Sequence, residues 1–284
     1  MCAVGDNVID WYPQESIVYP GGSAANSAVF ARRLGIDSAY VGILGSDGQA
    51  SFIVESLEHE RVDVSHVQWR DEASSRTDVF IDKDGNREFR AFIPPKSTIE
   101  LDAETCAFLN GAAWIHTGHS SFTEHHLEAL ATIAPVSFDF SKKDQDYAAD
   151  LLPHVHYAAF SREDDPEKDC LELLEYARSR GATFALVTRG SRGAIASTPD
   201  GVFTQAAAPA DVVDTIGAGD AFQTCFISGL VAGKPVQAAL EEAGRFAAEV
   251  CSYRGAFGHG QQMELAPQLD PASSTYQPPY RGTS

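Results

Sequence analysis

The sequence predicts an α/β fold: a doubly wound, mainly parallel sheet flanked by helices, with a small β lid. Three observations support this prediction. Short apolar runs alternate with helical patterns along most of the chain, as expected for parallel strands joined by crossover helices. Two segments instead show period-two alternation, which is typical of half-buried strands. The 284 residues, of which 44% are hydrophobic, can bury a substantial core without disulfides.

The N-terminal part of the chain begins with a strand–helix–strand–helix order. We expect a strand at 1–5, a helix at 23–34, a strand at 38–44 and a helix at 49–60. Ser23 is a suitable cap for the first helix, and Gly35 is suited to end it.

The same alternation returns after residue 100. The expected strands cover 113–117, 135–140, 155–160 and 183–188. The helices between them are expected at about 102–110, 123–132, 144–152 and 166–180. Two further helices, at about 218–232 and 235–253, complete a single domain that we place at 1–266.

The period-two segments lie at about 9–20 and 76–93. In the second, Asp84-Gly85 is a hairpin turn signal between two strands. We interpret both segments as a β lid, although an ordinary edge hairpin has the same pattern. Residues 267–284 are rich in Pro, Ser and Tyr without apolar periodicity, so we expect an extended or disordered tail there.

Composition excludes several classes of function. The formal net charge of −19 argues against nucleic-acid binding, which needs clustered Lys and Arg. It does not argue against a nucleotide, because backbone N–H groups, a helix N-terminus and a metal ion can hold phosphates. The five cysteines form no C-x-x-C pair, so the sequence indicates neither a metal site of that kind nor a disulfide framework. No apolar run reaches the length of a membrane span, and we expect a cytoplasmic protein.

The segment Asp214-Thr215-Ile216-Gly217-Ala218-Gly219-Asp220 precedes an apolar helical run. Gly217, Ala218 and Gly219 leave room for backbone N–H groups to converge on an anion at the helix N-terminus. Asp220 lies in the same first turn, where the helix dipole favours a negative charge. We therefore expect it to be ionised and to serve as the base that deprotonates an attacking hydroxyl. The alternative is a tight turn with a capping aspartate.

This segment resembles the second signature of the pfkB, or ribokinase-like, family of carbohydrate kinases. The first signature resembles residues 21–28, which read Gly-Gly-Ser-Ala-Ala-Asn-Ser-Ala. The resemblance covers roughly residues 1–258. It implies a ribokinase-like fold and transfer of the γ-phosphoryl group of ATP to a hydroxyl, with Asp220 as base and 217–219 as the anion hole.

The resemblance also implies substrate contacts. Gly21 and Gly22 would form the hinge between lid and body, and Asp6 and Asn26 would contact substrate hydroxyls, as a carboxylate and an amide can do. Without a ligand, Asp6 would be the start of an Asx turn and Asn26 a surface residue.

For the nucleotide, the family pattern matches Thr188, Gly190 and Gly193, and Ser161 stands where the family often has Asn. The carboxylate that binds Mg²⁺ would then be Asp164, with Glu163 as the alternative. Arg189 and Arg192 would face phosphates or solvent. A monovalent cation such as K⁺ would be held around Asp214, Ile216 and the segment 253–256.

Two further stretches, 4–10 and 138–141, resemble those of fructoselysine 6-kinases within the family. The alternatives are a kinase for a simple sugar (fructose, ribose or 2-keto-3-deoxygluconate) or a nucleoside, and a non-catalytic sugar or nucleotide sensor. Charged residues on the lid segments are expected to be exposed strand charges rather than substrate ligands: Asp10, Arg76, Asp78, Arg87 and Arg90. Exposed lid strands can pair between subunits, which favours a homodimer.

Overall fold

The computed structural model describes residues 1–81 and 87–263. In this part of the chain, eight strands form one large sheet in the order β14-β13-β12-β11-β10-β9-β1-β4. The strands are β1 (Cys2–Val4), β4 (Ala39–Val41), β9 (Ile115–Gly118), β10 (Val136–Ser141), β11 (Tyr157–Ser161), β12 (Phe184–Thr188), β13 (Ala194–Thr198) and β14 (Gly201–Gln205). All neighbours from β4 to β12 are parallel, which confirms the predicted mainly parallel sheet. The antiparallel hairpin β13–β14 at one edge was not predicted.

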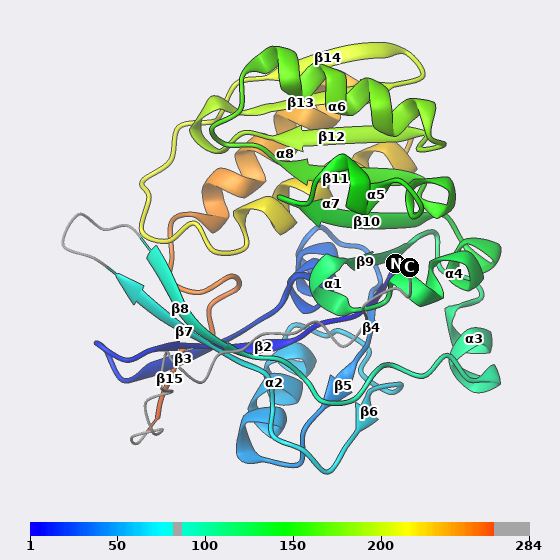
Figure 1. The fold of residues 1–284 in the computed structure, drawn as a ribbon. Coiled ribbons are helices and arrows are strands. Elements are labelled where there is room, and N and C mark those ends of the chain that lie inside the picture. The colour runs from blue at the N-terminus through cyan, green and yellow to red at the C-terminus, as the bar shows by residue number, and fades with distance from the viewer. Residues whose placement is uncertain (82–86, 264–284) are drawn as a thin grey trace.

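Helices cover both faces of the large sheet (Figure 1). They are α1 (Ser23–Arg33), α2 (Gly48–His59), α3 (Ala103–Leu109), α4 (Leu127–Ile133), α5 (Gln145–Ala148), α6 (Glu167–Ser179), α7 (Ala218–Val231) and α8 (Val236–Val250). Short 3₁₀ turns are η1 (His119–Ser121), η2 (Glu124–His126), η3 (Leu152–His154) and η4 (Gly190–Arg192). Aspartate side chains cap the N-termini of α2, α3 and α5, although no motif predicted these caps. They are Asp47, Asp102 and Asp144.

Alternation along the strands divides the core into two layers. Ala158 and Phe160 of β11 pack with α3–α6, whereas Ala159 between them packs with α7 and α8. Phe138, Phe140 and Phe160 are at most 1% exposed, and burying each stabilises the fold by about 1.5–3 kcal/mol. The doubly wound arrangement follows from this alternation.

A second sheet has the order β15-β3-β2-β7-β8. Its strands are β2 (Val8–Tyr12), β3 (Ile17–Gly21), β7 (Arg76–Ile81), β8 (Arg87–Ile93) and β15 (Gln261–Gln262). Both predicted lid segments therefore belong to one sheet, in which β2 pairs antiparallel with β3 and parallel with β7. The predicted turn Asp84-Gly85 and the tail 267–284 lie outside the described residues.

The remaining strands, β5 (Ile43–Leu44) and β6 (Gln68–Trp69), form a short parallel pair. Within the described ranges, none of the helices combines the length and the apolar character needed to cross a bilayer.

Candidate active site

A cavity of about 1330 Å³ lies where the carboxyl ends of the parallel strands face the small sheet. Ligands bind at this edge of open α/β sheets as a rule. Loops after β1, β9, β10 and β11 form its floor, while β2, β7 and β8 contribute its other side (Figure 1). Five of the predicted site residues line it: Asp6, Gly22, Asn26, Gly217 and Asp220.

Asp6 holds three segments together at one end of this cavity. Its Oδ2 accepts a hydrogen bond from the Ser23 N–H (2.7 Å), and its Oδ1 accepts from the Ala24 N–H (3.2 Å) and the Ser121 hydroxyl (2.8 Å). The carboxylate thus satisfies the first N–H groups of α1. Ser23 itself does not cap α1, because the N-cap residue is Gly22 and makes no side-chain cap. Contact of Asp6 with substrate stays a prediction.

The two glycines before α1 are required by close packing. A Cβ at Gly22 would lie 2.6 Å from the Asn7 Cα, and Gly22 has φ +108°. A Cβ at Gly21 would lie 2.6 Å from Asp10 Oδ2. Glycine at both positions therefore lets α1 begin against the β1–β2 turn.

Asp220 lies directly against the start of α1 at the edge of the cavity. Its Oδ1 accepts from the Ser23 hydroxyl (2.8 Å), and its Oδ2 accepts from the Asn26 amide (2.7 Å). The Asn26 Oδ1 is buried without a hydrogen-bond partner, so it can accept from a bound hydroxyl. The two family signatures, almost 200 residues apart in sequence, therefore meet at one carboxylate.

The protonation state of Asp220 differs from the expectation. Burial, and after it the charge of the nearby Asp139, raise the pKa of this carboxyl to about 7, against the hydrogen bonds from Asn26 and Ser23. The helix dipole alone suggested a fully ionised group, but it does not outweigh burial beside another carboxylate. A base whose pKa lies near neutral pH is well matched to proton abstraction.

Asp139 lies on β10, within the stretch 138–141 that resembles fructoselysine 6-kinases, although no role was predicted for it. Burial raises the pKa of its carboxyl, and the charge of His119 acts in the opposite direction. The Gln223 amide donates to Asp220 Oδ1 (3.5 Å) and also interacts with Asp139. Gln223 thus lies between the two acids.

Replacing Asp139 with Asn is expected to shift the acid limb of the pH profile of kcat/KM. In the wild type this limb should fall near pH 7, where Asp220 becomes protonated. Removing the negative charge of Asp139 lowers the pKa of Asp220, so the limb should move to lower pH. Rates measured from pH 5 to 9 check this, and an unmoved limb would show that the two acids are not coupled.

The anion loop, Thr215–Gly219, leads into α7. Gly217 is the N-cap with φ +79° and makes no side-chain cap, so the first N–H groups of α7 are not satisfied by that residue. A Cβ at Gly217 would lie 2.7 Å from the Ala256 Cβ, whereas one at Gly219 would meet nothing within 4 Å. Gly217 therefore serves backbone packing, and Gly219 keeps the helix start open. Ala218 is the first residue of α7.

The predicted nucleotide residues lie at neighbouring strand ends. Ser161 and Thr188 pair in register on β11 and β12, and their hydroxyls lie 3.3 Å apart. A Cβ at Gly193 (φ +82°) would lie 1.9 Å from the Gln205 carbonyl oxygen. Gly190 also has positive φ. The structure brings these residues together, but they do not line the cavity.

Arg189 and Arg192 make structural contacts. The Arg189 guanidinium pairs with Glu167 (3.0 Å), and Arg192 donates to the backbone carbonyls of Arg162 and Glu163. Glu163 lines the cavity, whereas Asp164 does not. The geometry thus favours Glu163 over Asp164 as the carboxylate that faces a bound metal. In the described ranges, no three His, Cys, Asp or Glu side chains are grouped for metal binding.

Lys142 and Lys143 line the cavity, although no motif in the sequence predicted them as site residues. Their loop begins at Ser141, which has φ +50°, and it is held by Arg162, whose guanidinium donates to the carbonyls of Ser141 (2.8 Å) and Lys143. The available signal was two adjacent lysines directly after a predicted strand, in a chain with a net charge of −19.

Charged residues of the small sheet are buried, contrary to the expectation. Asp10 is 5% exposed and lines the cavity. Arg76 and Asp78 are 6% and 3% exposed and form an ion pair at 2.8 Å, and the Arg76 guanidinium lies 4.2 Å from the centre of the Trp11 ring. Period-two alternation could not show this, because both faces of these strands are covered. The side chains of Arg87 and Arg90 lie outside the described set.

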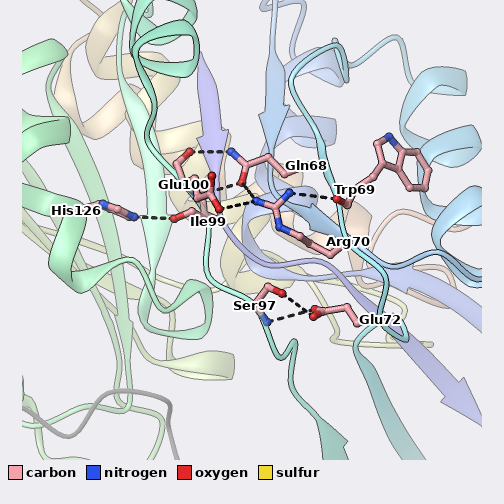
Figure 2. A network of polar contacts seen from close by, with 8 residues as sticks. All are labelled: Gln68, Trp69, Arg70, Glu72, Ser97, Ile99, Glu100 and His126. Carbon is pink, nitrogen blue, oxygen red and sulfur yellow. Dashed lines mark hydrogen bonds and ion pairs between the residues drawn. The ribbon is translucent and has the colours of Figure 1, made fainter.

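The segment after β8 forms one wall of the cavity and is anchored on the body (Figure 2). The Glu72 carboxylate accepts from the Ser97 hydroxyl (2.7 Å) and from its N–H (3.4 Å). Gln68 and Glu100 exchange two hydrogen bonds, of 2.7 and 3.0 Å. Further contacts join Arg70 to Glu100 and His126 to Ile99. This wall is therefore fixed while the strands between 76 and 93 extend beyond it.

A helix start suited to an anion, with a carboxylate of near-neutral pKa in its first turn at the edge of a cavity, defines a phosphoryl-transfer enzyme. Residues 6–259 match the model described as pfkB family carbohydrate kinase, and the chain belongs to that family. It is thus a phosphotransferase with an alcohol group as acceptor.

Relatives and solved structures agree with this assignment. The chain is 37% identical over 270 residues to fructosamine kinase FrlD of Bacillus subtilis (strain 168), covering 93% of this chain and 95% of the relative. It is 31% identical over 262 residues to fructoselysine 6-kinase of Escherichia coli (strain K12), covering 90% and 99%. The ribokinase of Arabidopsis thaliana complexed with ribose and ATP has a TM-score of 0.76 at 20% identity, covering 90% and 93%. The last comparison confirms the predicted ribokinase-like fold.

Proposed function

We propose that this kinase transfers the γ-phosphoryl group of ATP to a hydroxyl of a fructosyl-amine, the adduct of a ketosugar with an amino acid. The observation that carries the proposal is the position of Asp220, hydrogen-bonded to Ser23 and Asn26 at the start of α7. The 37% identity to fructosamine kinase FrlD supports the choice of acceptor.

Asp220 is the proposed base. An acceptor hydroxyl bound in place of the Ser23 or Asn26 donor would give its proton to the carboxylate as its oxygen attacks the γ-phosphorus and the bond from that phosphorus to the leaving ADP breaks. Backbone N–H groups at Gly217, Ala218 and Gly219 would stabilise the negative charge on the transferred group. The base has a pKa close to neutral pH, which suits proton transfer at that pH.

Asp10, Asn26 and Asp6 are the proposed readers of the sugar, with Gly21 and Gly22 keeping α1 close to it. A fructosyl-amine carries an ammonium group, which favours a carboxylate partner over a neutral one. Asp10 is a buried carboxylate on the cavity wall. It therefore suits the amine end of the substrate better than the exposed charges of the surface do.

We place the nucleotide near Ser161, Thr188, Gly190 and Gly193, with Lys142 and Lys143 facing its phosphates. Mg²⁺ would be held mainly by those phosphates and water. Glu163 lines the cavity and fits this role better than Asp164. The metal would neutralise charge on the triphosphate.

The small sheet is proposed to act as a lid that excludes water from the transfer. The described edge strands of the small sheet are β15, of two residues, and β8, of seven, so we propose β8 as the strand through which a homodimer would form. We also propose that the protein is cytoplasmic and that its kinase domain spans residues 1–266.

An ADP-release assay with ATP and Mg²⁺ tests the function. The panel should hold fructoselysine, fructosyl amino acids linked through the α-amine, fructose, ribose, 2-keto-3-deoxygluconate and nucleosides. We expect kcat/KM for a fructosyl-amine to exceed that for fructose by at least about tenfold, the effect of one charged hydrogen bond. Equal rates with fructose would remove the amine from the proposal, and binding of ATP without any turnover would favour a sensor.

A further inference from the structure

Asp214, at the start of the segment that leads into the anion loop, is a buried carboxylate with donors from three parts of the chain. It is 1% exposed. Its Oδ1 accepts from the Ile216 N–H (2.8 Å), and its Oδ2 accepts from the Tyr12 hydroxyl (2.9 Å) and the Gly255 N–H (3.1 Å). The donors belong to the anion loop, to β2 of the small sheet and to the segment after α8. The carboxylate thus fixes the positions of all three.

These are the segments that would be expected to hold a monovalent cation, and their donor set does not fit one. A K⁺ site is built from oxygen atoms that turn their lone pairs toward a common point. Around Asp214, two N–H groups and one O–H group point their hydrogens at the carboxylate instead. A carboxylate has about four lone-pair positions, and these donors occupy at least three of them. The stabilisation that a cation would supply to the buried charge comes from the donors.

The Tyr12 hydroxyl is held firmly in this position. Tyr12 is fully buried, and its ring meets that of Tyr19 edge to face, with centroids 5.3 Å apart. Val79 and Ile216 pack against the same pair of rings. Gly255 approaches so closely that a Cβ there would lie 2.5 Å from the Tyr19 ring. Packing therefore fixes the phenol oxygen without help from a ligand.

We propose that the hydroxyl of Tyr12 takes the place of a monovalent cation at Asp214, so that the anion loop is held in its working position without one. Tyr12 is then a positioning residue, acting on Gly217–Gly219 through Asp214 and Ile216. It also ties the small sheet to the anion loop. Only the kinetic part of the test depends on the proposed kinase function.

The first part of the test compares the wild-type protein in KCl and in choline chloride at equal ionic strength. We expect the same thermal midpoint and a kcat within about twofold in both salts. A saturable rise of either quantity with K⁺ would overturn the proposal. Measuring the thermal midpoint requires no sugar substrate, so this comparison tests the role of K⁺ even if the proposed acceptor is wrong.

The second part compares Tyr12→Phe with Tyr19→Phe, which alters a ring of the same cluster but keeps the Tyr12 hydroxyl that donates to Asp214. Losing one hydrogen bond to a buried carboxylate should lower the midpoint of Tyr12→Phe by roughly 2–10 °C and raise KM for ATP about tenfold. KCl should restore part of both losses in Tyr12→Phe, since the carboxylate then lacks one donor. If the two variants behave alike in either salt, the hydroxyl does not hold the loop and the proposal falls.

Discussion

Asp220→Asn should lower kcat by roughly 10²–10⁴-fold, the usual contribution of a positioned base. Asparagine has nearly the shape of aspartate and can still accept from the Ser23 hydroxyl, which lies 2.8 Å from Oδ1. It cannot take the proton of the acceptor hydroxyl. Nucleotide binding depends on backbone groups and on other side chains, so the dissociation constant for ATP should change by no more than a few-fold.

Steady-state rates with the best acceptor of the panel, together with calorimetric titration of ATP, measure the two quantities separately. Asp211→Asn is the matched control, because Asp211 is an exposed carboxylate shortly before the same loop. It should behave like the wild type. Turnover by Asp220→Asn within tenfold of wild type would show that another group accepts the proton.

Gly22→Ala should reduce the free energy of unfolding by about 2–5 kcal/mol, the sum of backbone strain and overpacking. Gly22 has φ +108°, and an added Cβ would lie 2.6 Å from the Asn7 Cα and 2.8 Å from the Asp6 carbonyl oxygen. Asn7 cannot yield, because its amide donates to the Tyr40 hydroxyl (2.7 Å) and to the Ile43 carbonyl (2.6 Å). Since whole domains are stable by only about 5–15 kcal/mol, the loss is large.

Urea unfolding followed by fluorescence measures this change. Gly35→Ala is a matched control, because Gly35 also has positive φ (+81°) but an added Cβ would meet nothing within 4 Å. The free energy of unfolding of that variant should fall only by the cost of backbone strain, about 1–2 kcal/mol. If Gly22→Ala costs no more than Gly35→Ala, the contact with Asn7 is softer than the distances indicate.

Local patterns predicted the parallel strands of the large sheet, and the family resemblance implied that both signatures contribute to one site. The Asn26 amide on α1 and the Asp220 carboxylate on α7 lie 2.7 Å apart. Helix bounds such as Ser23–Arg33, expected at 23–34, followed from apolar spacing and from Gly35 after the helix, although the predicted cap Ser23 was wrong.

Features that depend on tertiary packing were not predicted. The burial of Asp10 and Arg76 arises because β2 and β7 pair and are covered on both faces, which no alternation within one strand reveals. The near-neutral pKa of Asp220 depends on its burial and on Asp139, which approaches from β10. Likewise, the cap of α1 comes from Asp6 on another segment rather than from Ser23. Each requires two distant parts of the chain to be placed together.

The contact between Glu72 and Ser97 allows the small sheet to change, and with it the range of substrates, while the catalytic residues stay in place. It joins the two ends of the stretch that carries β7 and β8 on the body of the protein (Figure 2). When the ends of a stretch are already held together, changing its length adds little loop-closure entropy, about 0.6 kcal/mol for each doubling. The intervening hairpin can therefore be exchanged between homologues as a cassette, while the base and the anion loop keep their geometry.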